Sequence, residues 1–480
     1  MIERPRTSRY NLAVELGCGG EAAYALLNPL SGSFDLASRE ELERLVLLEE
    51  GGQPGAGDAT FLDYLRERGY LWGDGEGERR LLDEKFREFN RLLEESPPQL
   101  FIIPTYACNL ECHYCYQRDL PPREGVISPA VVEAFFETVE ARFAEKKVKP
   151  FITLYGGEPL IPSPRQVAAV SRLAAGTARL GYELAVVTNG YGLQDYLHVL
   201  GQAPIKEIQV TLDGAEAIHD ARRPAAGGEG TFARILAGVE EAVRRGWPVN
   251  LRVVLDRENL PYLPELATIV ERRGWLELGP ERFKTQLGRN YELFACDARP
   301  GGLYSPLELW QAVVELGKRY PVVRRFHAPE FKGLRHLAEA GELYPPTFDA
   351  CPAFKKEWVF DLYGHIYWCT ATCGREDFRA GTFWPEWELL PGKVEPWLRR
   401  NIFSIRQCRE CPVALLCGGG CGAVAYRENG EVGSPQCRPV AELVAMGVIY
   451  YRREILQRAH VPCLQSGEVA PAFHEKGGRK

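Results

Sequence analysis

The chain contains no long uninterrupted apolar segment. Its longest apolar run towards the C-terminus, Leu443 to Tyr451, is far shorter than the roughly 20 residues that cross a bilayer as a helix. The first residues carry several charges and lack the apolar core and small-residue cleavage site of a secretory signal. We therefore expect a cytoplasmic protein without a membrane-spanning segment.

The chain also lacks an excess of positive charge. Its 58 Lys and Arg residues stand against 65 Asp and Glu residues, which gives a formal net charge of -7. This balance argues against nucleic acid or an acidic membrane surface as a partner. With 45% hydrophobic and 26% charged residues among 480, the composition is that of a soluble globular protein, and the length suggests about three domains.

Cysteine is too rare for a disulfide scaffold. The chain has 14 cysteines in 480 residues, whereas small disulfide-held proteins reach roughly 8–10%, and a reducing compartment disfavours disulfides. Three of them, Cys18, Cys296 and Cys463, are isolated, and we expect buried unreactive thiols there. The other cysteines form three tight groups, which indicates metal binding. The groups are Cys108, Cys112 and Cys115; Cys351, Cys369 and Cys373; and Cys408, Cys411, Cys417, Cys421 and Cys437.

Residues 1–95 are predicted to form a small module. Strand-like segments over residues 10–16, 23–28 and 32–36 precede helical patterns over 38–50 and 60–71. This order resembles a winged module like those that recognise the leaders of ribosomally made, modified peptides (RiPPs). Its strand edges would suit capture of an extended peptide by strand addition. A lid or packing domain is the alternative interpretation.

Residues 96–300 alternate between strand-like and helix-like segments. The helical pattern over 128–147 has a sound start, with Ser128 as N-cap and Pro129 at the first helical position. Six strands with intervening helices imply an α/β fold whose functional site lies at the carboxyl ends of parallel strands. We predict a partial (β/α)6 barrel. Its strands cover residues 100–105, 151–156, 183–189, 207–213, 250–256 and 282–288.

The rest of the chain is expected to form three parts. Residues 301–346 have the pattern of a helical bridge. Residues 347–440 are rich in cysteine and have few long periodic runs, which suggests a domain held together by metal. Residues 441–480 comprise an amphipathic helix and a polar tail.

The first cysteine group directly follows the first predicted barrel strand. Cys108, Cys112 and Cys115 are close enough in the chain for one loop to ligate three irons. A four-iron cluster normally takes four cysteines, so three local ligands would leave one iron free for a small molecule. A zinc site is the alternative, with His113 as its nearest fourth ligand.

This run resembles the signature of the radical S-adenosylmethionine (radical SAM) enzymes, C-x3-C-x-aromatic-C, with Tyr114 at the aromatic position. The resemblance implies a partial barrel, a four-iron cluster and S-adenosylmethionine (SAM) as cofactor. It also implies that the open iron chelates the amino and carboxylate groups of SAM, which is cleaved to methionine and a 5′-deoxyadenosyl radical. The family leads us to expect a flavodoxin or ferredoxin as reductant.

Further motifs follow the second and third predicted strands. The first resembles the GGEP motif of the family, in which Gly156 and Gly157 permit close backbone approach. We expect the Glu158 carboxylate to meet the SAM ammonium group. The side chains of Thr188 and Asn189 can bond the sugar or amino-acid part of the cofactor.

Polar residues also follow the fourth predicted strand. We expect the Thr211 hydroxyl to make a similar contact with the cofactor. Asp213 and Arg222 complete a polar rim that resembles the peptide-modifying branch of the family. Arg222 either holds the SAM carboxylate or makes a structural ion pair. The sequence singles out no catalytic acid or base.

The later cysteines resemble the SPASM domain, a C-terminal extension of radical SAM enzymes. Cys351 is followed by Gly364 and Cys369, and later come Cys408-x2-Cys411-x5-Cys417-x3-Cys421 and Cys437. One or two zinc ribbons are the alternative. The resemblance implies two auxiliary four-iron clusters, and hence three clusters in the protein.

The same resemblance divides the later cysteines into two sets. An outer cluster would take Cys408, Cys411, Cys417 and Cys437. A cluster nearer the barrel would take Cys351, Cys369 and Cys421. Either Cys373 closes this nearer cluster, or one of its irons stays open.

These features suggest a maturase of a ribosomally made peptide. The N-terminal module would hold the leader, a radical would abstract a hydrogen from the peptide, and one electron would pass to the nearer cluster. The product would be an oxidative thioether or carbon-carbon cross-link. Alternatives are a maturase of a protein subunit, as in amine dehydrogenase thioether formation, and an anaerobic sulfatase maturase, although Thr370 stands where the latter typically carries Asp. The SAM motifs disfavour a non-enzymatic iron-sulfur scaffold.

Overall fold

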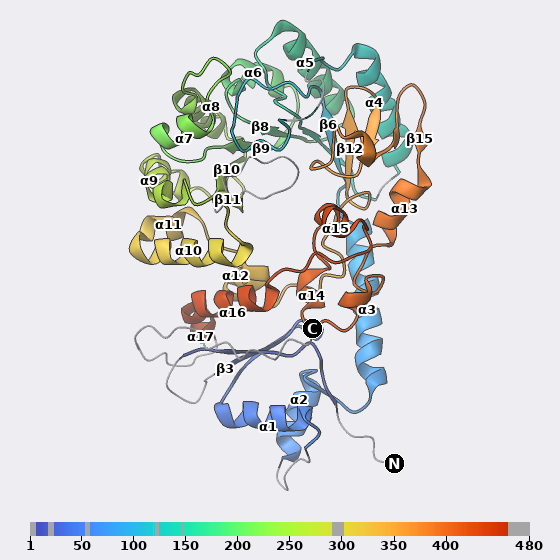
Figure 1. Cartoon of the computed structure of the whole chain (residues 1–480), viewed down its shortest axis with the longest axis vertical. Coiled ribbons are helices and arrows are strands. Elements are labelled where there is room, and N and C mark those ends of the chain that lie inside the picture. Colours follow the sequence, from blue (N-terminus) through green and yellow to red (C-terminus); the bar gives the residue numbers. More distant parts are fainter. Residues whose placement is uncertain are drawn as a thin grey trace.

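The computed structural model describes residues 6–17, 24–52, 58–118, 120, 124–145, 147–289 and 302–458 (Figure 1). Three predicted buried thiols, Cys18, Cys296 and Cys463, lie outside the described residues, as does the predicted polar tail beyond residue 458. None of the described helices is both long and apolar enough to span a membrane.

A ten-stranded sheet forms the centre of the molecule. The six predicted barrel strands are all present in it, and each pairs in parallel with its neighbour. The predicted α/β class and the six parallel strands of the partial barrel are therefore confirmed. In order across the sheet the strands are β6 (Gln99–Ile103), β7 (Phe151–Leu154), β8 (Leu184–Thr188), β9 (Ile205–Thr211), β10 (Val249–Leu255) and β11 (Phe283–Arg289).

Helices cover the outside of these strands (Figure 1). Ser128 begins the first of them as predicted, because its side chain accepts a hydrogen bond from the Val131 amide and Pro129 follows it. The apolar face of this helix buries residues such as Phe135 in the main core. The helices are α4 (Pro129–Phe143), α5 (Pro164–Arg179), α6 (Leu193–Leu200), α7 (Glu216–Arg222), α8 (Phe232–Arg244) and α9 (Leu263–Arg272), with short turns η1 (Leu260–Tyr262) and η2 (Trp275–Glu277).

The Cys-rich segment begins by extending the barrel sheet. Strand β12 (Glu357–Asp361) pairs in parallel with β6. The antiparallel strands β13 (His365–Tyr367), β14 (Arg379–Thr382) and β15 (Glu388–Leu389) follow. Backbone hydrogen bonds therefore anchor this segment to the barrel, and the sheet continues beyond the boundary predicted near residue 347. Periodicity does not reveal this pairing, because β6 and β12 are far apart in the chain.

The N-terminal module contains a three-stranded antiparallel sheet packed against two helices. Its strands and both helices match the predicted segments. The long helix α3 (Gly75–Glu94) was not predicted, because its residues are mostly polar and none is fully buried. The other elements are β1 (Arg6–Thr7), β2 (Leu12–Glu15), β3 (Tyr24–Asn28), β4 (Ser33–Ala37), α1 (Arg39–Glu49), α2 (Ala59–Glu67) and β5 (Leu71–Trp72).

The predicted bridge and the predicted C-terminal helix are both helical. The C-terminal helix is divided at Tyr451, and Val444 and Val448 share a core with Val14 of β2 and Leu334. The bridge and C-terminal helices therefore pack against the N-terminal module (Figure 1). They are α10 (Pro306–Arg319), α11 (Pro321–Phe326), η3 (Phe331–Gly333), α12 (Leu334–Ala340), α16 (Val440–Tyr450) and α17 (Arg452–Arg458).

Short helices complete the Cys-rich segment between β13 and α16. They hold the later cysteines close to the bridge and to α3, since Cys408 and Phe348 share a small core with Phe86 of α3. The elements are η4 (Glu376–Phe378), α13 (Pro391–Arg399), η5 (Arg406–Cys408), α14 (Ala414–Cys417) and α15 (Gly422–Asn429).

Candidate active site

The first cysteine group lies on the loop that follows β6, at the carboxyl end of the parallel strands. Cys112 is buried with Leu110 and Ala225, and Cys108 and Cys115 pack against this small cluster. Burial raises the pKa of the Cys108 thiol to about 12, and it also raises the pKa of Cys112. Thiolates at these positions therefore need a nearby cation, which a bound metal supplies.

The spacing of the thiols argues against a single zinc ion. Among the described residues, no three thiols bring their sulfur atoms within 4.8 Å of one another. A tetrahedral zinc ion with Zn–S bonds of about 2.3 Å holds its sulfurs about 3.8 Å apart. His113 groups with Asp256 and Glu258 instead of the cysteines. The arrangement fits a cluster whose irons each take one thiolate.

Gly156 and Gly157 bring the turn after β7 against the first cysteine loop. The Gly157 amide donates to the Thr105 carbonyl at 3.1 Å. A Cβ atom on Gly157 would lie 2.2 Å from the Ala107 carbonyl oxygen, and one on Gly156, whose φ is 140°, would lie 2.4 Å from the Thr105 carbonyl oxygen. Glycine is therefore required for this approach, although the neighbour in the structure is the chain itself.

Glu158 lies in a network of protein hydrogen bonds beside the first cysteine loop. Its carboxylate is completely buried and accepts hydrogen bonds from the Thr188 hydroxyl at 2.6 Å and from the amides of Leu160 and Asn189. Burial raises its pKa to about 7. Thr188 in turn accepts from the Gly190 amide. The Glu158 carboxylate and the Thr188 hydroxyl thus tie β7 to β8, and their contacts with SAM stay a prediction.

Asn189 and Thr211 lie at the ends of their strands as expected. The Asn189 side chain donates to Asn109 at 2.9 Å and lies 3.8 Å from the Cys108 sulfur, so it borders the first cysteine group. Thr211 is half-buried at the end of β9, and its hydroxyl has no hydrogen bond to any other described residue. Both therefore remain candidates for contact with a cofactor.

Tyr114 and Asp213 connect the cysteine loop to the segment after β9. The Tyr114 hydroxyl donates to the Asp213 carboxylate, which is fully buried and also accepts from the Val254 amide at 2.9 Å. Burial raises the pKa of Tyr114, so its phenol keeps the proton. Asp213 therefore orients Tyr114. It lies beside Arg222 as the predicted polar rim requires, and its contact with a cofactor stays a prediction.

Arg222 makes the structural ion pair that the sequence left as one of its two alternatives. Its guanidinium is nearly fully buried and donates twice to Asp256, at 3.0 and 2.8 Å. It also lies 3.6 Å from Asp213. The positive charge of Arg222 thus lies among these carboxylates, and its guanidinium also lies 5.1 Å from the centre of the Tyr114 ring on the cysteine loop.

Arg223 is the residue that the sequence analysis missed. It is buried, its guanidinium donates to the Tyr114 hydroxyl at 2.5 Å, and its charge acts on Cys112. Its Nε atom has no hydrogen-bond partner among the described residues. An unpartnered donor beside three thiols fits a bound carboxylate such as that of SAM. The two adjacent arginines of the sequence were the available signal. Helix α7 ends at Arg222, and both guanidinium groups lie over the Tyr114 ring, 5.1 and 5.9 Å from its centre.

The later cysteines lie in two neighbourhoods. Burial raises the pKa of Cys369 to about 12, and the charges of Cys351 and Cys421 raise it further. Burial also raises the pKa of Cys408 to about 11, and the charges of its neighbours contribute. Those neighbours are Cys417, Cys411 and Cys437. Cys373 is 1% exposed and lies between the Cys369 loop and the barrel.

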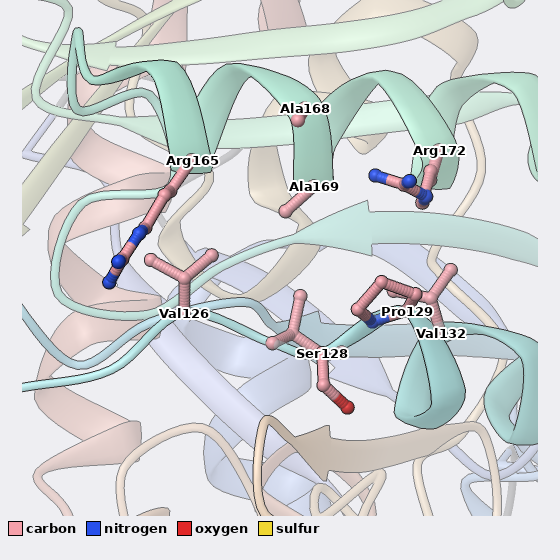
Figure 2. A pocket seen from close by; sticks show the side chains of 9 residues that line it. Val126, Ser128, Pro129, Val132, Arg165, Ala168, Ala169 and Arg172 are labelled. Atoms are coloured by element: carbon pink, nitrogen blue, oxygen red, sulfur yellow. The ribbon is translucent and has the colours of Figure 1, made fainter.

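A hollow of about 270 Å³ lies away from all of these residues, between α4 and α5 (Figure 2). Arg165 and Arg172 of α5 flank it, and both are exposed. Its other walls are mostly apolar, including Val126 and Val132. None of the predicted site residues lines it, so it is separate from the candidate active site.

Comparisons with known proteins agree with this site. Residues 102–269 match the family model described as the Radical SAM superfamily. The pre-heme d1 synthase of Dinoroseobacter shibae is 32% identical over 175 residues, which are 35% of this chain and 39% of that protein. The mycofactocin maturase MftC of Mycobacterium tuberculosis is 25% identical over 332 residues, which are 67% of this chain and 77% of that protein. The chain thus matches well under half of the length of the synthase, but most of the length of the maturase.

Two solved structures share the fold. Native anSMEcpe with bound AdoMet and Kp18Cys peptide aligns with a TM-score of 0.56 at 16% identity, covering 76% of this chain and 99% of that chain. Streptococcus suis SuiB bound to precursor peptide SuiA aligns with a TM-score of 0.50 at 15% identity, covering 91% of this chain and 99% of that chain. The chain thus contains a region, residues 102–269, that matches the radical SAM superfamily. It is an enzyme of radical chemistry, with SAM and an iron-sulfur cluster as cofactors.

Proposed function

We propose that this protein is a maturase that oxidatively cross-links a ribosomally made precursor peptide through a thioether or carbon-carbon bond. When bound, the cluster and SAM at the barrel site supply a radical that removes one hydrogen atom from the substrate. A cross-link is a net two-electron oxidation, so one further electron and one proton must leave. An electron acceptor beside the barrel site is therefore needed for this function.

The observation that carries the proposal is the contact between the first cysteine loop and the loop of residues 369–373. The Tyr116 hydroxyl donates to the Thr370 carbonyl at 3.2 Å, and the Arg375 guanidinium donates to the Tyr116 carbonyl at 3.3 Å. Tyr116 directly follows Cys115, and Thr370 directly follows Cys369. A cluster ligated by Cys369 would thus lie beside the barrel site, where it could accept the electron.

We assign seven later cysteines to two auxiliary four-iron clusters, which with the barrel cluster makes three. The assignment is supported by the two neighbourhoods of raised thiol pKa values and by the absence of three closely spaced thiols among the described residues. A flavodoxin or ferredoxin is the proposed reductant of the barrel cluster. The nearer set is Cys351, Cys369 and Cys421, and the outer set is Cys408, Cys411, Cys417 and Cys437.

We further propose that the N-terminal module binds the leader of the precursor peptide. Among the described strands, β4 lies at the edge of its sheet and pairs only with β3. A groove beside it is lined by apolar residues of α1 and α2, such as Leu42 and Phe61, together with the polar groups of Asp35 and Tyr64. An extended peptide can hydrogen-bond to such an edge and place alternate side chains in the groove. The SuiB structure described above contains a precursor peptide, and MftC is named a maturase.

A sulfatase maturase is the less favoured alternative. The residue after Cys369 is Thr370 and not Asp, and its carbonyl is already bound by Tyr116. The N-terminal module is also unnecessary for that reaction, whereas it provides a binding surface for a leader peptide. Modification of a protein subunit by the same chemistry is the other alternative, and the experiment below separates it from peptide maturation.

The test is mass spectrometry of a short candidate peptide, encoded beside this gene, after anaerobic incubation with the reconstituted enzyme, SAM and reductant. We expect a loss of two hydrogens per modified site that depends on SAM and is abolished in Cys108→Ala. Fragmentation would then locate the new bond. An unchanged peptide, together with accumulation of 5′-deoxyadenosine, would contradict peptide maturation for that peptide and would direct the search to protein subunits.

A further inference from the structure

Although no predicted site residue lines the hollow between α4 and α5, the hollow lies beside the root of the first cysteine loop. One of its walls is formed by Val126, which comes just before α4. The carbonyl of the preceding Gly125 accepts a hydrogen bond of 2.7 Å from the Thr105 hydroxyl at the end of β6. Cys108 is three residues beyond Thr105, a distance of at most about 11 Å along the chain. The hollow therefore opens on the surface close to the loop that would hold the barrel cluster.

The face of α5 that lines the hollow consists of two alanines framed by two arginines (Figure 2). The four residues have the i, i+3, i+4, i+7 spacing of a single helix face, and they are Arg165, Ala168, Ala169 and Arg172. Both arginines are exposed, and neither guanidinium has a hydrogen bond or an ion pair with any other described residue. The hollow thus has an apolar floor between two cations without partners in the part of the chain that the structure describes.

The residues of α4 that line the hollow supply no negative charge, since they are Pro129 and Val132. Further along the same two helices the arrangement is different. Arg179, about two turns beyond Arg172, pairs with Glu140 of α4 at 3.4 Å. One end of the contact between α4 and α5 is therefore closed by an ion pair, whereas the end beside the cysteine loop presents two cations to an outside partner.

The N-termini of the two helices add to the positive potential beside the hollow. Ser128 and Ser163 are the N-caps of α4 and α5, and neither helix has an acidic residue in its first turn. Arg165 is the second residue of α5, where the partial positive charge of the helix end disfavours a cation. An occupant with carboxylates would be attracted by the arginines and the helix ends, and an apolar side chain among those carboxylates would fill the space over the alanines.

We propose that this hollow is the docking site of an acidic electron-carrier protein that reduces the barrel cluster. The proposal rests on the proposed function, since it assigns a surface to the proposed flavodoxin or ferredoxin. The reduced carrier would lose one electron, which passes to the barrel cluster and is consumed when SAM is cleaved to methionine and a 5′-deoxyadenosyl radical. Redox encounters of this kind use small interfaces, under about 1,200 Å², and depend on complementary charge for their rate. A hollow of about 270 Å³ framed by two arginines suits such an encounter.

The first test compares protein and small-molecule reductants with the full-length reconstituted enzyme. Formation of 5′-deoxyadenosine is measured with limiting reduced flavodoxin, with limiting reduced ferredoxin and with dithionite, which needs no docking site. In the double variant Arg165→Glu, Arg172→Glu we expect the rate with the effective carrier to fall about tenfold or more at low salt. The rate with dithionite should stay unchanged, and the difference between parent and variant should shrink as salt screens the exposed charges.

The matched control is Arg179→Glu, compared with the single variant Arg172→Glu. Both substitutions reverse one exposed charge on α5, but Arg179 does not line the hollow. Only Arg172→Glu should slow the reaction with the carrier. Unchanged rates with both carriers in the double variant would overturn the proposal. So would an equal loss with carrier and with dithionite in the Glu variants and in the milder Arg165→Gln, Arg172→Gln, because the effect would then not concern docking.

The second test fills the hollow without changing its charge. Ala168 is exposed, so Ala168→Trp places a bulky side chain over the hollow and leaves the core intact. We expect a higher KM for the carrier and an unchanged rate with dithionite. An unchanged KM would show that the carrier docks elsewhere, and the proposal would be wrong.

The precursor peptide is the other occupant that these variants test. If the double variant bound a labelled peptide more weakly but kept the parent rate with the carrier, the hollow would belong to the substrate and the proposal would be overturned. Cross-linking of the candidate peptide with dithionite as reductant tests the proposed function separately. Its absence in the parent would count against that function, whereas the rates with the carriers would still decide where the electron carrier docks.

Discussion

Arg223 donates a hydrogen bond of 2.5 Å to the hydroxyl of Tyr114, which lies on the first cysteine loop. The contact joins the end of α7 to the loop after β6, and it leaves the Nε atom of Arg223 without a partner among the described residues. Buried donors of this kind are rarely left unpaired in a working site. We therefore expect Arg223 to bind the carboxylate of SAM.

Replacing Arg223 by Gln should weaken SAM binding. A hydrogen bond to a charged group contributes about 1.5–3 kcal/mol, which corresponds to an increase in Kd of roughly tenfold to a hundredfold. Equilibrium dialysis of SAM against the reconstituted protein measures this change, with 5′-deoxyadenosine formation as a second readout. Arg234→Gln, which removes an exposed arginine paired with Asp195, is the control and should leave the Kd unchanged. An unchanged Kd in Arg223→Gln would contradict the assignment.

Replacing Arg222 by Gln should lower the stability of the fold. Asp256 and Asp213 would remain buried without their cation, and breaking such a pair typically costs about 3–5 kcal/mol. A drop in the thermal unfolding temperature measured by circular dichroism would show this effect, and so would a drop in soluble yield. If Arg222→Gln instead unfolded at the parent temperature but lost SAM affinity, the roles of the two arginines would be reversed.

The barrel was predictable from the sequence, whereas the roles of several site residues were not. Strands such as β6 are continuous apolar runs followed by turn residues, and such a pattern can be recognised from neighbouring residues alone. The difference between Arg222 and Arg223 depends on where α7 ends, and the burial of Glu158 depends on strands that only the fold brings together. Helix α3 was not predicted because most of its residues are polar. Local patterns thus predict the strands and the cysteine loops, but not the contacts between elements.

Replacing Gly157 by Ala should disrupt the first cysteine loop. The added Cβ would lie 2.2 Å from the Ala107 carbonyl oxygen and 2.3 Å from that of Tyr106, so the loop must move. We expect the reconstituted variant to lose the barrel cluster, roughly four irons per chain, with the auxiliary signals retained. Gly433→Ala is the control, because a Cβ there meets no atom within 4 Å. A full iron content in Gly157→Ala would show that the loop tolerates the displacement.

His219 should make the stability of the protein depend on pH. It is completely buried, its Nδ1 accepts from the Asp213 amide at 3.1 Å, and its Nε2 donates to the Thr231 hydroxyl. Burial lowers its pKa from 6.5 to about 3, and the charges of Arg223 and Arg222 lower it further. Below pH 6.5 the unfolded chain therefore binds a proton that the folded chain does not, and stability falls as the pH falls towards 3.

We expect the free energy of unfolding to be about 1.4 kcal/mol lower at pH 5.5 than at neutral pH, because pH 5.5 lies one unit below the pKa of the unfolded histidine. Urea unfolding of the parent and of His219→Gln at pH 7 and pH 5.5 measures the difference. Between pH 7 and pH 5.5, the free energy of unfolding should fall further in the parent than in His219→Gln. His198→Gln, which changes an exposed histidine, should behave as the parent does. Equal losses in the parent and in His219→Gln would exclude His219 as the source.

Replacing Leu42 by Asp should weaken binding of the leader peptide to the N-terminal module. Leu42 lines the groove beside β4, and a charge there would have to be desolvated when an apolar side chain of the leader enters. We expect at least a tenfold increase in the Kd of a fluorescently labelled leader, measured by anisotropy with the full-length protein. Leu47→Asp is the matched control, because Leu47 belongs to the same helix, is 51% exposed and lies outside the groove. Equal effects of the two substitutions would place the leader elsewhere, and the β4 edge would then lose its proposed role.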